Sequence, residues 1–351
     1  MTARVERLRA ELDRLEVAAA LVTNPVNARY LTGLESSNAF VLVEHKEVVL
    51  FTDGRYVEAA GTLEGVRAVR LERDLARDLS SRLPEFTDGP LAIEADHVTL
   101  VIHEHLLASG VELVPTQGLV LRLRAVKESA ELEAIRRAAR ILTDAYNRLL
   151  QETIVGRSER ELAWWFEQVL HEEGAHERAF PTIVASGANT ALPHHRPGER
   201  RIERGDVVIV DAGASVDGYC SDCSRTFSAG DVPDELRRAY ATCRAAQEAA
   251  LAEARPGAGT QELDAIARRE IEEAGYDVLH GLGHGVGLEV HELPVLRREA
   301  EGALEAGNVV TLEPGVYVGG AGGVRIEDLV VVNEQGVELL TPVTKELLTL
   351  E

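Results

Sequence analysis

The first part of the chain alternates between helical and extended hydrophobic patterns. Residues 1–16 carry apolar side chains at steps of three and four, as an amphipathic helix does. These apolar positions are Val5, Leu8, Leu12 and Leu15. Three apolar runs follow, AAALVT, AFVLVE and EVVLFTD, and a tight turn around Glu44 to Glu47 joins the last two. Such short runs, bounded by polar residues, are typical of buried strands. The pattern therefore predicts α/β structure here.

A long helical stripe follows the segment LRLRAVK, residues 121–127, and marks a change in the pattern. Its apolar positions are Leu132, Ile135, Ala139, Leu142, Tyr146 and Leu149. We place a domain boundary at this point, because the α/β pattern gives way to one long helix. The expected domains are residues 1–123 and 124–351.

The second part contains an internal repeat of helices. GRSERELAWWFEQVLHEEG, from Gly156, aligns with GAGTQELDAIARREIEEAG, from Gly257, at an offset of 101. Ser158 with Glu161 has the pattern of a capping box, and Thr260 gives a helix-start signal in the second copy. Each copy ends in a glycine, as expected of a helix C-terminus.

The repeat continues into strands that carry acidic residues. GDVVIVDAG aligns with GNVVTLEPG at an offset of 102, which places Asp211 opposite Glu313. Further along, Asp222 lies opposite Glu327 at an offset of 105. Two half-units related by a pseudo-twofold axis would bring these four carboxylates to one centre.

Four carboxylates in apolar strand contexts indicate a metal site. A single acid of this kind is usually a surface or turn residue, but buried charges are normally paired or bound to metal. Four carboxylates can hold two divalent ions roughly 3.5 Å apart with a hydroxide shared between them. Such a hydroxide attacks carbonyl groups, so the expected reaction is metal-assisted hydrolysis of an amide or ester.

The stretch GHGVGLEVHE offers two imidazoles, His284 and His291. Its three glycines disfavour a helix, so we expect an extended or looped segment in which the two histidines can have different roles. One imidazole nitrogen among oxygen ligands shifts the preference from magnesium or calcium towards manganese, cobalt, iron or zinc.

Composition narrows the possible partners and location. The chain has 351 residues, 45% of them hydrophobic and 27% charged, which is ordinary for a globular protein. A formal charge of −22 excludes the basic footprint that nucleic acids and anionic membranes require. The N-terminus lacks a signal-peptide core and no run reaches membrane-span length, so we expect a cytoplasmic protein.

Three cysteines are too few for a disulfide framework. Cys220 and Cys223 form a C-x-x-C motif that is typical of zinc or redox pairs, but no second pair completes a four-thiolate site. We therefore interpret them as small strand residues.

The motifs that contain these acids resemble those of the pita-bread metallopeptidases. These contexts are IVDAG, GYCSDCSRTF, GLGHGVGLEVHELP, TLEPGVY and GGVRIED, and they extend over most of residues 180–330. The group includes methionine aminopeptidase, prolidase, aminopeptidase P and the metal-free creatinase. NARYLTG and FTDGRY resemble the creatinase/prolidase N-terminal domain, which methionine aminopeptidase lacks. The resemblance implies an α/β N-terminal domain followed by a pseudo-twofold pita-bread catalytic domain.

The resemblance also implies a ligand set for two divalent metal ions. Asp211 would bind one ion, His284 and Glu313 the other, and Asp222 and Glu327 would bridge both. Manganese is the expected metal, with cobalt, zinc and iron as alternatives. The intact ligand set argues against a metal-free, peptide-binding relative.

Further catalytic roles follow from the same resemblance. His291 and His194 would hold the substrate carbonyl and stabilise the tetrahedral intermediate. Glu313 would also relay a proton, and Arg325 would support the ligating carboxylates. His195 is expected at the surface without a function.

The expected substrates are peptides with proline at position two, and the expected assembly is a homodimer. A dipeptidase must recognise the free carboxylate of proline, for which an arginine is well suited. In some prolidase-type relatives an arginine follows the HE-x-P motif, whereas this chain has Val295 there. Aminopeptidase P is thus the first expectation and prolidase the alternative. Other candidate carboxylate readers are Lys46, Arg297 and Arg298, and candidate N-terminal contributors to the site are Asn27, Tyr30, Arg55 and Tyr56.

Overall fold

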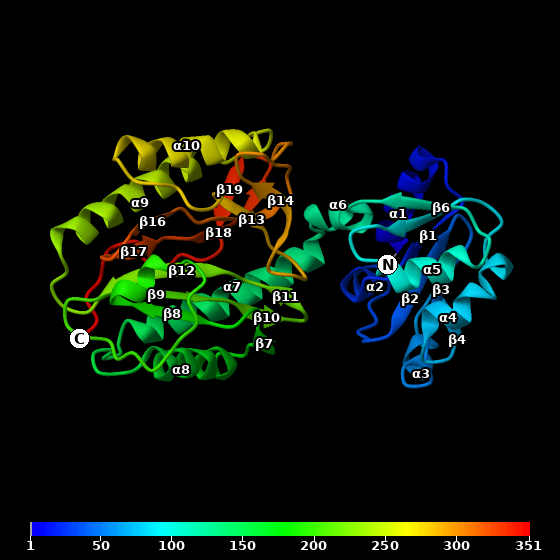
Figure 1. The fold of residues 1–351 in the computed structure, drawn as a ribbon, viewed down its shortest axis with the longest axis horizontal. Helices are drawn as coiled ribbons and strands as arrows, with labels where there is room; N and C mark the ends of the chain where they lie inside the picture. The colour runs from blue at the N-terminus through cyan, green and yellow to red at the C-terminus, as the bar shows by residue number, and fades with distance from the viewer. Residues whose placement is uncertain (1) are drawn as a thin grey trace. The chain divides into compact units, whose positions relative to one another are not determined.

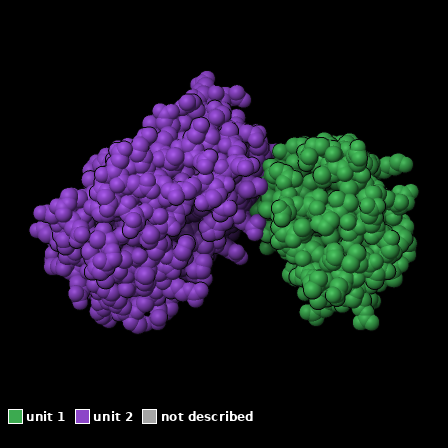
Figure 2. Space-filling model, turned by 45° about the horizontal axis from the view of Figure 1, so that its top comes forward, with its two compact units in different colours: residues 1–124 green, residues 125–351 purple. Residues whose placement is uncertain are grey.

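The computed structural model describes residues 2–351. They divide into two compact units, of which unit 1 ends at Arg124 and unit 2 is Ala125–Glu351. Figure 2 colours the two units separately, and each is described by itself below. No helix among the described residues combines the length and the apolar character needed to cross a membrane.

Unit 1 is built on a six-stranded mixed sheet in the order β4-β3-β2-β1-β5-β6. Its strands are β1 (Ala19–Val22), β2 (Ala39–Glu44), β3 (Val48–Thr52), β4 (Arg67–Arg70), β5 (Leu91–Glu94) and β6 (Leu113–Thr116). Its helices are α1 (Thr2–Leu15), α2 (Pro25–Thr32), α3 (Val57–Ala60), α4 (Leu75–Ser80), η1 (Leu83–Glu85), α5 (Leu100–Leu107) and α6 (Leu119–Ala125), the last of which reaches the boundary. The predicted first helix is confirmed from Thr2 onwards, Met1 lying outside the described residues: α1 buries Val5, Leu8 and Leu12, and Leu15 is partly buried. The three predicted strands are confirmed, because β1 to β3 are buried along most of their length.

Unit 2 consists of two similar halves of helices packed on strands (Figure 1). The first half contains α7 (Ser129–Leu149), α8 (Glu159–Glu172), β7 (Glu177–Arg178), β8 (Ile183–Ser186), η2 (Gly187–Ala191), β9 (Val207–Ala212), β10 (Ala214–Val216), β11 (Tyr219–Cys220) and β12 (Cys223–Ser228). The second half contains α9 (Asp234–Glu253), α10 (Thr260–Glu273), β13 (Gly283–Gly285), β14 (Glu292–Leu296), β15 (Val309–Leu312), β16 (Gly315–Val318), β17 (Gly322–Arg325), β18 (Asp328–Asn333) and β19 (Gly336–Leu339).

The repeat seen in the sequence corresponds to repeated elements. Helices α8 and α10 begin and end 101 residues apart, and both are followed by a glycine with positive φ, Gly174 or Gly275. Ser158 caps α8 in the predicted capping box. Thr260 does not cap α10, because Gly259 occupies the cap position and the Thr260 hydroxyl donates to the Gly302 carbonyl instead.

Each half of unit 2 has its own hydrophobic core. In the first half, α7 and α8 pack on β8, β9 and β12, and Tyr146 and Phe166 meet edge to face there. In the second half, α9 and α10 pack against residues of β14 to β18. Strands β9 and β12 and strands β15 and β18 form equivalent antiparallel pairs, and these pairs carry the acidic residues.

Candidate metal centre and active site

Four carboxylates lie at equivalent points of the two strand pairs. Asp211 is in β9 and Asp222 immediately precedes β12, while Glu313 immediately follows β15 and Glu327 immediately precedes β18. The two halves are joined here, because the Glu327 amide donates to the Ser224 carbonyl at 3.0 Å. Strand register therefore brings together acids that are about a hundred residues apart in sequence.

Three of these carboxylates contain a buried oxygen without a hydrogen-bond donor among residues 2–351. These oxygens are Asp211 Oδ1, Asp222 Oδ1 and Glu327 Oε1. Burial, and next the charge of Asp211, raises the pKa of Asp222 well above its usual range. Burial, and next the charge of Asp222, does the same to the pKa of Glu327. Clustered acids with unpartnered oxygens fit divalent cations, which would satisfy the oxygens and neutralise the repulsion.

His284 presents a ring nitrogen to this cluster. Its Nδ1 lies 3.1 Å from the Gly285 carbonyl, which can only accept, so Nδ1 carries the proton and Nε2 faces the acids. Nε2 is 3.1 Å from Glu313 Oε1 and 3.8 Å from Asp222 Oδ2. One ligand atom each of Asp222, His284 and Glu327 lies within 4.8 Å of the others. This donor set fits a metal ion held through His284 Nε2.

Glu313 and His284 form an ion pair in the structure. Burial alone would lower the pKa of His284, but the hydrogen bond and charge of Glu313 raise it to about 9. Burial alone would raise the pKa of Glu313, but the hydrogen bond and charge of His284 lower it to about 2. Glu313 is thus ionised at neutral pH.

His291 lies beside His284 but not among the acids. Their rings meet edge to face with centroids 4.4 Å apart, and His291 is exposed just before β14. The segment between them is looped after the short strand β13, as the glycines predict. His194 is exposed. The pKa of His291 is lowered overall, mainly by burial and next by the charge of His284, which Glu313 opposes. His194 makes a smaller contribution in the same direction, so it lies near His291.

Arg325 connects the acids to their surroundings. Its side chain is only 4% exposed, and its Nη2 donates to Asp211 Oδ2 at 2.6 Å. Its Nε donates to the Ser224 hydroxyl at 2.8 Å, and its Nη1 donates to the Pro193 carbonyl at 3.1 Å. Burial raises the pKa of Asp211 and Arg325 opposes this, so Arg325 compensates one of the buried charges.

Two residues that were not predicted from the sequence, His280 and Tyr317, orient Arg325. His280 Nδ1 faces the Gly281 carbonyl at 2.8 Å and therefore carries a proton. Burial lowers the pKa of His280, so the ring is neutral and its Nε2 accepts from the Tyr317 hydroxyl, 2.9 Å away. The Tyr317 oxygen in turn accepts from Arg325 Nη1 at 3.1 Å. Tyr317 lies in the TLEPGVY context and His280 directly precedes GLGHG, so proximity to the motifs was the available signal.

Other expectations from the sequence have different outcomes. His195 is not a surface residue: its side chain is 14% exposed and its Nε2 is 2.8 Å from Glu159 Oε2. Cys220 and Cys223 are buried free cysteines at a strand end and a strand start, which agrees with small strand residues.

The candidate N-terminal contributors make contacts inside unit 1. Asn27 donates to Glu94 and accepts from Arg124, and the Tyr30 hydroxyl donates to the Leu123 carbonyl. Arg55 pairs with Asp53, and the hydroxyl of Tyr56 is 2.9 Å from that of Ser37.

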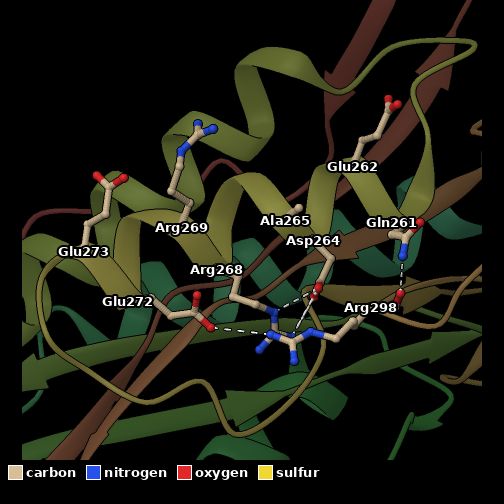
Figure 3. A pocket seen from close by; sticks show the side chains of 9 residues that line it. All are labelled: Gln261, Glu262, Asp264, Ala265, Arg268, Arg269, Glu272, Glu273 and Arg298. Carbon is tan, nitrogen blue, oxygen red and sulfur yellow. Dashed lines mark hydrogen bonds and ion pairs between the residues drawn. The ribbon is translucent and has the colours of Figure 1, made fainter.

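Arg298 lies in a separate pocket along α10 (Figure 3). Its Nη2 is 3.5 Å from Glu272, its carbonyl accepts from Gln261, and Arg268 pairs with Asp264 alongside. None of the predicted metal ligands lines this pocket, so Arg298 is engaged by α10.

Both units match known protein families. Residues 133–334 match metallopeptidase family M24, and residues 4–126 match the creatinase/prolidase N-terminal domain. The Xaa-Pro dipeptidase of Pyrococcus furiosus is 35% identical, and the alignment covers 99% of this chain and 100% of that protein.

Solved structures give the same picture. The Xaa-Pro dipeptidase from Bacillus anthracis is 36% identical with a TM-score of 0.95, and the X-Pro aminopeptidase from Thermotoga maritima is 33% identical with a TM-score of 0.87. Each alignment covers 99% of both chains. The architecture expected from the sequence is confirmed by these matches.

Proposed function

Because the chain belongs to metallopeptidase family M24, we propose that it is a Xaa-Pro dipeptidase, which hydrolyses the bond before proline in dipeptides. The observation that carries the catalytic part is the group of buried carboxylate oxygens without donors beside His284. The preference for dipeptides is supported by the relatives named Xaa-Pro dipeptidase, which align over 99% of this chain. The comparisons thus favour the alternative that the sequence left open over aminopeptidase P.

Five side chains would hold two divalent ions. These are Asp211, Asp222, His284, Glu313 and Glu327. Oxygen ligands with one imidazole suit Mn²⁺, and Co²⁺, Zn²⁺ or Fe²⁺ can replace it. Such ions, when bound, polarise the scissile carbonyl and lower the pKa of the attacking water.

The protein's own side chains would move protons and stabilise charge. Glu313, which is ionised at neutral pH, accepts a proton from the attacking water and passes it to the proline nitrogen, which must be protonated to leave. His291 and His194 present N–H groups to the substrate carbonyl as it gains negative charge. Arg325 keeps Asp211 charged and oriented through their hydrogen bond.

Aminopeptidase P activity is the second candidate, and the position of Val295 favours it. Val295 is the antiparallel partner of His284, so both side chains lie on the same face of the β13–β14 pair. An arginine at this position would lie on the same face as His284 and could bind the free carboxylate of a dipeptide, whereas valine cannot.

A cleavage panel on the manganese-loaded protein decides between the candidates. A dipeptidase should cleave Xaa-Pro with higher kcat/KM than Xaa-Pro-Yaa, and a Met-Ala peptide serves as the control substrate. The reverse order would identify an aminopeptidase P. A protein that retains no divalent ion and cleaves none of these peptides would be a binding relative.

The assembly is a separate proposal. We propose a homodimer, and light scattering that gives a monomer at micromolar concentration would contradict it.

A further inference from the structure

His194 lies in a single loop that contacts the carboxylate cluster through Arg325. The loop extends from η2 to Gly198, and the side chain of His194 is exposed. An exposed imidazole on a loop loses catalytic value unless its position is fixed, because small displacements of a reacting group are costly. The structure fixes both neighbours of His194: the Pro193 carbonyl accepts from Arg325, and the His195 ring contacts Glu159.

Glu159 is a fully buried carboxylate under this loop, at the start of α8. Its Oε1 accepts from the Ser186 amide at 2.9 Å, the Ser186 hydroxyl at 2.8 Å and Asn189 Nδ2 at 2.9 Å. Its Oε2 accepts from His195 Nε2 at 2.8 Å and from the Gly198 amide at 3.1 Å. One carboxylate therefore joins the beginning, the middle and the end of the loop.

The electrostatics favour an ionised Glu159. Burial alone would raise its pKa, but hydrogen bonds from Asn189, His195, Gly198 and Ser186 lower it overall. The position at the first turn of α8 adds a favourable helix dipole. Because a carboxylate can only accept, His195 Nε2 must carry a proton, which fixes the orientation of the ring next to His194.

We propose that Glu159 is a positioning residue for the reaction, which acts through His195 to hold His194 at the substrate carbonyl. This inference rests on the proposed role of His194. This role could not be predicted from the sequence, because an acid after Ser158 is typical of a helix start.

The test compares Glu159→Gln, His195→Ala and His195→Gln with the wild type on the Xaa-Pro peptide that is cleaved best. The side-chain amide of Glu159→Gln has only one oxygen that can accept, so the hydrogen bonds to one of the two Glu159 oxygens are lost. We expect Glu159→Gln and His195→Ala to lower kcat by about 10- to 100-fold with little change in KM and normal metal content. His195→Gln keeps an N–H donor and should restore most of kcat. Glu172→Gln, on the exposed side of α8, is the matched control and should leave kcat unchanged.

A double-mutant cycle with His194→Ala separates positioning from general destabilisation. If Glu159 acts through His194, Glu159→Gln should have little further effect on kcat in the His194→Ala background. An equal loss in both backgrounds, or loss of bound metal, would overturn the inference. If His194→Ala is defective while Glu159→Gln and His195→Ala are fully active, the positioning role of Glu159 is wrong and the proposed role of His194 stands. A fully active His194→Ala would overturn the proposed role of His194 as well.

Discussion

Two buried glutamates in unit 2 show that burial alone does not identify a metal ligand. Glu159 is 0% exposed and Glu327 is 1% exposed. Burial raises the pKa of Glu159, but hydrogen bonds outweigh burial and lower it overall, whereas burial and the neighbouring acids both raise the pKa of Glu327. Glu159 has hydrogen-bond donors on both oxygens, whereas Glu327 lies among other acids and its Oε1 has no donor within the described part of the chain. A bound divalent cation would compensate the charges of Glu327 and Asp222, whereas the hydrogen bonds of Glu159 already compensate its charge.

The first prediction concerns Asp222 in metal-free protein. A carboxyl group whose pKa is higher in the folded than in the unfolded state destabilises the fold once the pH exceeds the unfolded value of about 4, and the penalty grows up to the folded pKa. Asp222→Asn removes this penalty. After EDTA treatment the variant should melt at a higher temperature than the wild type, and the gain should be larger at pH 8 than at pH 5.

The same variant should retain no more than a few per cent of activity with manganese, because it lacks a carboxylate that is predicted to bridge the two ions. Asp231→Asn, at a fully exposed acid, is the control and should change neither property. A lower Tm for metal-free Asp222→Asn, or a gain that does not depend on pH, would contradict the electrostatic argument.

His291 provides the second prediction. Its ring contacts His284 but is exposed and lies outside the carboxylate cluster. His291→Ala should therefore keep nearly normal metal content while kcat falls by about 10²- to 10⁴-fold, as for loss of a group that stabilises developing charge. Metal analysis beside steady-state kinetics checks both parts. An emptied metal site would mean that His291, not His284, acts as the ligand.

At the scale of elements, the periodicity and the repeats of the sequence predicted helices and strands better than they predicted contacts between distant side chains. The apolar runs predicted β1 to β3, and the offset of 101 predicted that α8 and α10 are equivalent, because such patterns depend on local spacing. The offsets also predicted that the four carboxylates lie close together, because repeated strand pairs have the same register. The roles of Glu159 and His280 could not be predicted, since they arise from contacts between segments that are distant in sequence.

Gly283 gives a prediction at this scale. It begins β13, and a Cβ built at this position would overlap the Thr311 carbonyl oxygen of β15. Gly283→Ala must therefore push apart two strands that place His284 and Glu313. We expect a loss of about 1–3 kcal/mol in the free energy of unfolding, together with weaker metal binding, measured by thermal melts and metal titration. Gly319→Ala, where the added Cβ meets no atom within 4 Å, should change neither quantity. A Gly283→Ala variant with wild-type stability and affinity would show that the strands need not be this close.

At the scale of the molecule, unit 2 consists of two halves with separate cores whose predicted metal ligands meet at one centre. The first half supplies Asp211 and Asp222, and the second supplies His284, Glu313 and Glu327. Their acids repel one another without cations, as the raised pKa values of Asp222 and Glu327 indicate. Bound metal would therefore link the halves, and metal binding should stabilise unit 2 as a whole.

The last prediction is that this stabilisation is confined to unit 2. A ligand at 100 times its Kd stabilises the folded state by about 2.7 kcal/mol, which raises the Tm of a domain of this size by about 5–10 °C. Hydrogen exchange should show greater protection in residues 207–228 and 283–328 when Mn²⁺ is added, because these segments carry the ligands. The six-stranded sheet of unit 1 contains none of the predicted ligands, so its exchange should not change. Asp222→Asn should lose most of the shift. Equal protection in both units would mean that manganese acts on the protein generally rather than by joining the two halves of unit 2.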